Sequence, residues 1–208
     1  AEIKKRDYDK ALKIQKKIAG SAFGISVDFQ LGYNSTNANA DATSDQQQVT
    51  TTSKGGFAFG ALLNVNLLGF GFSTGLDFTK KNFGIQIPYY NSTSSVDSIS
   101  TNLSNSYMNI PLNVNFGGMI SDDVGLSFSG GPYFGILLNP DNAVSGFKDF
   151  DFGLNGILTG RYYLNPFMAI ILGTQGQYGG LNNLLSSSSV ETLHTFNWGL
   201  FTGLNVGF

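Results

Sequence analysis

The sequence has no cysteine, a single histidine and few charged residues. Without cysteine, neither a disulfide framework nor a thiolate metal site is possible. Charged residues make up only 12% of the chain, whereas soluble domains usually contain ~25%. No apolar run approaches the roughly 18 residues that a transmembrane helix needs, which excludes a helical membrane protein. The composition therefore fits neither an ordinary soluble surface nor a helical membrane anchor.

The few charges are unevenly placed along the chain. Seven of the twelve basic residues lie in the first 17 positions, and the rest of the chain has five basic residues against eleven acidic ones. An acidic body argues against nucleic acid as a partner.

What the sequence has in abundance is alternation of apolar with small polar residues, a period of two that is typical of strands. In AFGISVDFQLGY, at 22–33, one face is wholly apolar. The same pattern predicts further strands near 55–67, 70–80, 106–117, 124–137, 150–162, 167–178 and 195–208, which makes eight in all.

Long and short connections alternate between these segments. Long polar connections are expected at 34–54, 81–105, 138–149 and 179–194, and tight turns around residues 68–69, 121–123 and 164–166. This is the plan of an outer-membrane barrel, with external loops, short periplasmic turns and both termini in the periplasm. We therefore predict an all-β, eight-stranded antiparallel up-and-down transmembrane β-barrel at 21–208, after a basic amphipathic helix or disordered leader at 1–20.

The polar face of the strands distinguishes this barrel from a soluble one such as a lipocalin. A soluble barrel would carry many Lys and Glu residues on that face, whereas here it is mostly Gly, Ser, Asn and Gln. Nearly the only charges are Asp28, Asp77, Asp151 and Arg161, which we predict to lie in the lumen.

Large apolar residues interrupt the polar face near the middle of several strands. We predict that they meet across the lumen as a plug that closes it to ions, formed by Leu62, Ile157, Ile171 and Phe201, with Tyr133 as a fifth member. A register error would instead turn these side chains toward lipid.

The chain ends on an apolar strand with a terminal Phe. This ending resembles the signal by which outer-membrane proteins engage the barrel-insertion machinery, and Leu204, Val206 and Phe208 would carry it.

Several stretches resemble the PorT-like family of small outer-membrane β-barrel domains. They are YMNIPLNVNF at 107–116, GGPYFGILL at 130–138, FDFGLNGIL at 150–158, GQYGGLNNL at 176–184 and the final aromatic strand. Family members often have a basic residue before the Tyr of the fourth stretch, where this chain has Gln177. The resemblance implies fold and location and no activity.

No catalytic, cofactor or metal site is expected. His194 lies near the serine run at 186–189, but a triad needs a geometry that spacing alone does not give. The acidic loop residues match no calcium loop.

The segment KKNFGIQIPYYN at 80–91 continues to alternate beyond the expected membrane edge. Either the second hairpin extends above the membrane, or an exposed apolar ledge for a partner forms there from Phe83, Ile85, Ile87 and Tyr89.

We expect a non-enzymatic, monomeric outer-membrane protein with a closed lumen, in contact with membrane lipids and acting structurally or through its external loops on an unidentified surface partner. The alternatives are a narrow channel or transporter for a small molecule and a loop-borne hydrolase or acyltransferase.

Overall fold

The computed structural model describes residues 24–42, 49–67, 70–90, 96–139, 147–180 and 190–208. The predicted N-terminal helix at 1–20 lies outside the described residues. Among these described residues, no helix is long and apolar enough to span a membrane.

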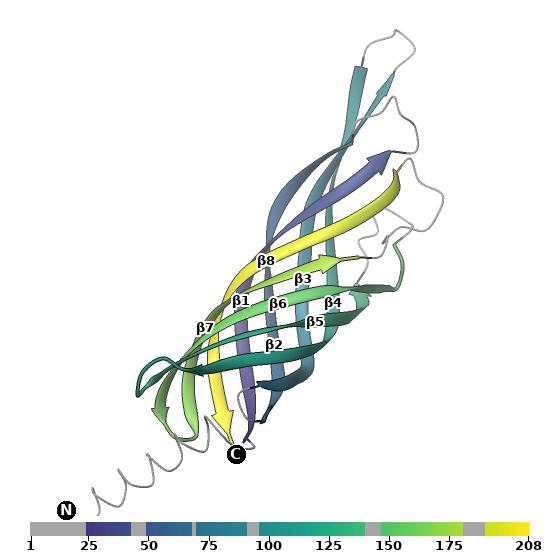
Figure 1. Cartoon of the computed structure of the whole chain (residues 1–208). Coiled ribbons are helices and arrows are strands. Elements are labelled where there is room, and N and C mark those ends of the chain that lie inside the picture. The colour runs from purple at the N-terminus through teal and green to yellow at the C-terminus, as the bar shows by residue number, and fades with distance from the viewer. Residues whose placement is uncertain (1–23, 43–48, 68–69, 91–95, 140–146, 181–189) are drawn as a thin grey trace, which may run out of the picture.

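Eight antiparallel strands form a closed barrel in which each strand pairs with its neighbours in sequence, and the last pairs with the first (Figure 1). The strands are β1 (Gly24–Ala42), β2 (Thr50–Leu67), β3 (Phe70–Tyr90), β4 (Val96–Met119), β5 (Val124–Asn139), β6 (Phe150–Asn165), β7 (Met168–Gly179) and β8 (Val190–Gly207). The predicted transmembrane β-barrel is therefore confirmed.

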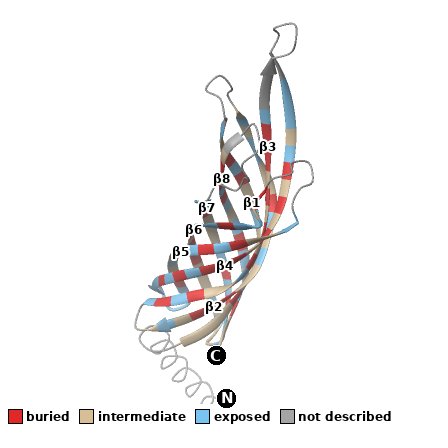
Figure 2. Cartoon of the chain, turned by 90° about the vertical axis from the view of Figure 1, so that its right-hand side faces the viewer, coloured by how far each residue is buried: buried red, intermediate tan, exposed pale blue. Residues whose placement is uncertain are grey.

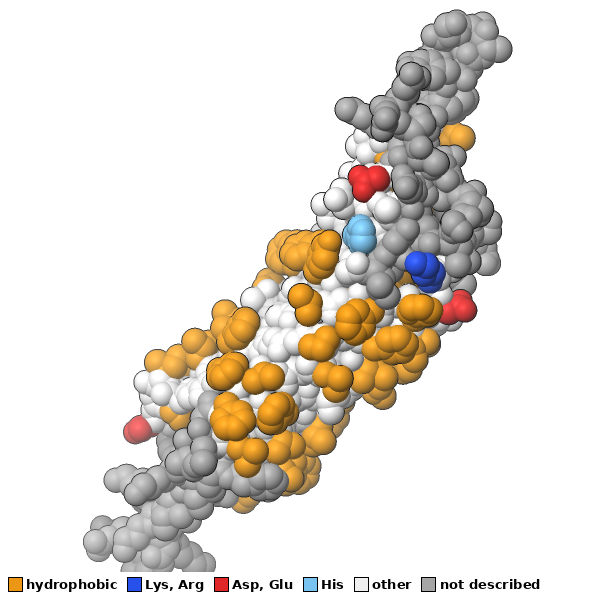
Figure 3. Space-filling model, turned by 45° about the vertical axis from the view of Figure 1, so that its right-hand side comes forward, with side chains coloured by type: hydrophobic (Ala, Val, Ile, Leu, Met, Phe, Trp, Pro, Cys, Tyr) orange, Lys and Arg blue, Asp and Glu red, His pale blue; other side chains and the backbone are white. Residues whose placement is uncertain are grey.

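Side chains alternate between a buried lumen and an apolar outer surface, as Figure 2 shows along the strands. On β1, for example, Asp28 is 2% exposed whereas the next residue, Phe29, is 52% exposed. Figure 3 shows hydrophobic side chains gathered over the middle and lower part of the barrel surface, with few charges among them. This belt is the surface that a lipid bilayer would cover.

The two ends of the barrel differ in their connections. At one end, the short-turn end, the strands join across 68–69, 120–123 and 166–167, close to the expected turns. At the other, the long-connection end, the connections are longer than these turns. The first two are much shorter than expected, because β1 and β3 continue to Ala42 and Tyr90, and β2 and β4 already begin at Thr50 and Val96. The loops predicted at 34–54 and 81–105 are thus largely strand, which corrects the sequence prediction.

The extended strands make the barrel taller on one side. β4 pairs with β5 only from Ser106 onward, and β7 pairs with β8 only up to Tyr178 opposite Phe196. Beyond these points β8 pairs with β1 as far as Val190 opposite Ala42, and β2, β3 and β4 pair with one another as far as Val96 opposite Tyr90. The β1–β2 ladder itself ends at Thr36 opposite Lys54, and hydrogen bonds from the Ser53 and Thr51 hydroxyls to β1 carbonyls join the two parts above it. We call this part the five-stranded wall, and in Figure 1 its β3–β4 hairpin reaches farthest from the C-terminus.

Candidate functional site

The lumen is filled by side chains in layers, and β8 crosses them in order. From the short-turn end, its buried residues are Asn205, Phe201, Asn197, Thr195 and Leu193. Each of these five residues marks one layer. Asn205 lies in a polar pocket, Phe201 in an apolar plug and Asn197 in a layer of amide side chains. Thr195 belongs to a network around a buried lysine, and Leu193 belongs to an outer apolar cluster. The lumen is therefore the candidate functional site.

The plug layer consists of Leu62, Ile157, Ile171 and Phe201, which are 0–6% exposed and pack as one cluster. They come from β2, β6, β7 and β8, so the cluster joins strands on both sides of the line where β8 pairs with β1. The structure thus places the four predicted residues together inside the lumen.

A glycine makes room for the aromatic member of the plug. Phe201 lies directly opposite Gly173 on β7, and a Cβ atom at Gly173 would clash with the Phe201 ring and with the Leu158 carbonyl oxygen. Since real side chains do not approach so closely, the phenyl ring needs glycine at this position.

Tyr133 was expected in the plug, and this expectation is wrong. It is buried, but it pairs with Gly153, whereas Ile157 of the plug pairs with Ser129. Tyr133 therefore lies two inward-facing positions farther toward the long-connection end, because the strands are staggered around the barrel. There its hydroxyl donates a hydrogen bond to Asp151 Oδ2 at 2.7 Å.

Tyr133 belongs to a buried network around Lys81. The Lys81 ammonium lies 2.7 Å from Asp151 Oδ2, 3.3 Å from Thr195 Oγ1 and 3.4 Å from the Tyr133 hydroxyl. It also lies over the rings of Tyr107 and Tyr133, at 4.8 Å and 5.4 Å from their centroids. The aromatic faces and the carboxylate together compensate a cation that has lost its water.

Sequence reasoning missed Lys81 because it was assigned to an external loop. The alternation of side chains along β3 could have located it. Asp77 was already predicted to face inward, and Lys81 lies four residues later on the same face of the strand. A buried Asp151 also required a cation, and Lys81 is 1% exposed beside it.

Asp77 lies in the amide layer below this network. Its Oδ2 accepts hydrogen bonds from Thr79 at 3.1 Å, Gln177 at 3.2 Å and Gln175 at 3.3 Å. Asn197 connects this layer to β1, because its Oδ1 accepts a hydrogen bond from Asn34 at 2.6 Å. Gln177 is therefore a neutral donor to a lumenal carboxylate.

Above the lysine network, apolar side chains line the inner surface of the five-stranded wall. This outer apolar cluster comprises Ala38, Phe83, Ile85, Leu103, Phe147 and Leu193. Phe147, from the connection between β5 and β6, is 7% exposed and packs against residues of the wall. The cluster is a second apolar layer beyond the plug.

The predicted partner ledge is contradicted by the burial of two of its four members. Phe83 is 1% and Ile85 is 9% exposed, because both face inward on β3 with the same parity as Lys81. The side chains of Ile87 and Tyr89 lie outside the described residues, although their backbone belongs to β3.

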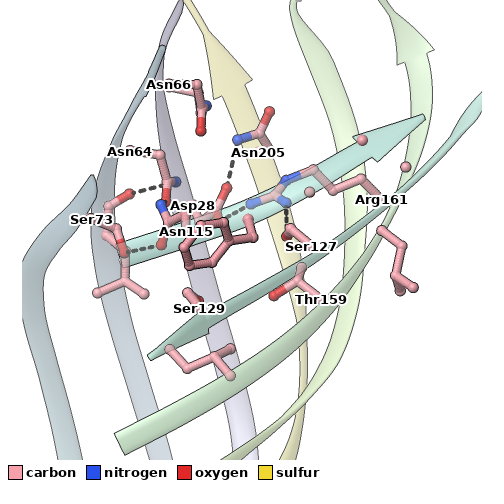
Figure 4. Close-up of a pocket in the computed structure, with 18 of the residues that line it drawn as sticks. Asp28, Asn64, Asn66, Ser73, Asn115, Ser127, Ser129, Thr159, Arg161 and Asn205 are labelled. Atoms are coloured by element: carbon pink, nitrogen blue, oxygen red, sulfur yellow. Dashed lines mark hydrogen bonds and ion pairs between the residues drawn. The ribbon is translucent and has the colours of Figure 1, made fainter. Parts of the chain in front are cut away.

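At the short-turn end a polar pocket of about 110 Å³ lies beneath the plug (Figure 4). Arg161 donates from one nitrogen to Asp28 Oδ2 at 2.7 Å and from another to Ser127, while Asn205 donates to Asp28 Oδ1. Across the pocket, Ser73 donates to Asn115 Oδ1 at 3.0 Å. Asp28 and Arg161, predicted in the lumen, thus form one ion pair there.

The residues of the predicted insertion signal lie on the outer surface at the end of β8. Leu204 is 44% and Phe208 78% exposed, and Val206 is half-buried. The Phe208 amide donates to the Ile25 carbonyl at 2.9 Å, which ties the end of the chain to β1.

Among the described residues, His194 contacts a backbone carbonyl and an aromatic ring. Its Nδ1 lies 3.2 Å from the Gly179 carbonyl oxygen, and its ring stacks on Tyr178 with centroids 6.3 Å apart. Within the same residues, no group of three His, Cys, Asp or Glu side chains is arranged to hold a metal ion.

No protein-family model matches the sequence, and no curated protein matches it either. Among solved structures, neisserial surface protein A is 15% identical, and the match covers 86% of this chain and 97% of that chain with a TM-score of 0.52. The outer membrane protein OprG from Pseudomonas aeruginosa is also 15% identical, with 90% and 97% covered and a TM-score of 0.48. At this identity, the likeness to neisserial surface protein A shows the fold alone, which is that of eight-stranded outer-membrane barrels.

Proposed function

We propose that this chain is a non-enzymatic protein of a Gram-negative outer membrane, with a closed lumen and a structural or surface-interaction role. The apolar belt would lie in lipid, the short turns and both termini in the periplasm, and the five-stranded wall outside the cell. The apolar final strand would engage the barrel-insertion machinery, and the barrel would act as a monomer.

The observation that carries the proposal is the apolar plug layer in the lumen, with the outer apolar cluster beyond it. The plug layer and the outer apolar cluster lie on either side of the amide layer and the lysine network, whose charged groups are bonded to one another and to neutral donors. A channel for ions or small polar solutes needs a continuous polar path, and the plug layer places apolar side chains from four strands in that path. This supports a role outside transport.

The five-stranded wall supports a role at the surface. It extends beyond the belt, and both of its faces are exposed at the start of β4, where Ser98, Ile99 and Ser100 are all exposed, Ile99 at 59%. The structural environment of His194 favours this role over the loop-borne enzyme, because its described partners are a backbone carbonyl and an aromatic ring.

Planar lipid bilayers test the proposal directly. The refolded wild-type chain should insert and remain electrically silent, since water and ions fit poorly past Phe201 and its neighbours. Heat-modifiable migration in electrophoresis would verify that the silent sample is folded. Steady, reproducible single-channel conductance of the folded wild-type chain would contradict the closed lumen and favour the transporter.

A further inference from the structure

The pocket beneath the plug has features that a closed structural barrel does not require. It is lined by side chains from seven of the eight strands, and the labelled polar groups in Figure 4 point into it from opposite walls. Exposed residues at its rim, such as Asn66 and Met119, show that it reaches the surface at the short-turn end. It is therefore accessible while the plug is closed.

The charges in the pocket cancel. Asp28 is paired with Arg161 and also accepts a hydrogen bond from Asn205, and Asp28 is 2% exposed. An anion would have to displace Asp28 from the guanidinium, and a cation would have to displace Arg161 from the carboxylate. The pocket thus selects against ions of either sign.

Two hydroxyl groups and part of the guanidinium remain for a ligand. Among the described residues, the hydroxyls of Ser129 and Thr159 have no hydrogen-bond partner, and Thr159 is only 3% exposed. Arg161 has five donors, of which the described contacts use two. Leu62 and Ile157 of the plug contribute apolar surface to the same pocket.

We propose that this pocket binds a neutral polyhydroxylated molecule, either a small polyol or the end of a larger one that extends from the short-turn end. Its hydroxyl groups would bond to Thr159, Ser129 and the free donors of Arg161, and its carbon chain would lie against Leu62 and Ile157. The cavity of about 110 Å³ is smaller than the ~150 Å³ that encloses benzene, so only a few heavy atoms are fully enclosed.

Titration of the isotope-labelled barrel in lipid nanodiscs by NMR tests the proposal, with glycerol and erythritol as probes. Both polyols should shift the amide resonances of Thr159 and Asn205 saturably, while 1-butanol and sodium acetate should leave them unchanged. Thr159→Val removes one hydroxyl at nearly constant shape and should weaken erythritol binding about fivefold, the equivalent of one hydrogen bond. Ser129→Leu should abolish binding by filling the cavity.

Thr202→Val is the matched control, because Thr202 lies on the outer surface and donates to the Ile171 carbonyl. It should leave erythritol binding unchanged. The proposal is overturned if neither polyol gives a saturable shift, if acetate binds as tightly as erythritol, or if folded Thr159→Val binds erythritol as the wild type does.

Discussion

Lys81 on β3 and Asp151 on β6 form an ion pair of 2.7 Å inside the lumen, with 1% and 0% of their side chains exposed. Two strands, β4 and β5, separate them around the barrel, so the pair bridges the lumen. A buried pair of this kind contributes little net free energy as a pair, but losing one partner is costly because the other is left as an uncompensated charge.

Removing either charge should therefore destabilise the barrel strongly. Lys81→Met and Asp151→Asn should each lower the free energy of unfolding by about 3–5 kcal/mol, measured by urea unfolding in lipid vesicles. The double variant should lose less than the sum of the two single losses. Lys54→Met is the control, because Lys54 makes an exposed contact to Asn102, and its effect should stay below about 1 kcal/mol. Additive losses in the double variant would mean that the pair is not coupled.

Opening the plug should allow ions to pass. A Phe201→Gly, Ile171→Gly variant removes two side chains that are 6% and 0% exposed in the plug layer. If the outer apolar cluster leaves a path for water, the variant should conduct in planar bilayers where the wild type is silent. If it remains silent, adding Phe147→Gly should produce conductance. A folded triple variant that stays silent would show that other layers close the lumen.

Gly173 should tolerate no side chain. A Cβ atom there meets both the Phe201 ring and the backbone of β6, so Gly173→Val should reduce refolding yield and lower the urea midpoint. Phe201→Leu should restore part of the yield by removing the ring contact. Gly176→Val serves as the comparison, because a Cβ atom at Gly176 meets nothing within 4 Å. Equal effects at the two glycines would argue against the ring contact as the cause.

The absence of native cysteine allows the orientation to be measured with single introduced cysteines. Ile99→Cys, on the five-stranded wall, should react with a membrane-impermeant maleimide on intact cells. Asp122→Cys, between β4 and β5, should react only after the outer membrane is permeabilised. The opposite pattern would mean that the barrel is inserted with its short turns outward.

The apolar belt predicts that the chain depends on an amphiphile. Leu31, Leu154, Leu172 and Leu200 are each more than 60% exposed, and exposed apolar surface on this scale drives association in water. Size-exclusion chromatography should give a monodisperse monomer in detergent and aggregates after detergent removal. A monodisperse monomer without detergent would contradict the transmembrane assignment.

Sequence reasoning located the strands within the belt but not their continuation beyond it. On β3, Phe78 faces outward whereas Phe83, five residues later, faces the interior. Within the belt the outer face contacts lipid and is apolar, but on the five-stranded wall the apolar face turns inward. The five-residue spacing between Phe78 and Phe83 therefore marks the point where the apolar face changes from outside to inside. In the sequence alone, the same break in the alternation indicates the end of a strand.

The alternation of residue types by itself determined the number of strands, the polar lumen and the four members of the plug, because period-two side-chain placement is a local property of the backbone. The partners of the lumenal charges were decided only by the tertiary structure. Which residues share a depth depends on the stagger between strands that are distant in sequence. That stagger pairs Lys81 with Asp151, moves Tyr133 out of the plug and brings Arg161 to Asp28.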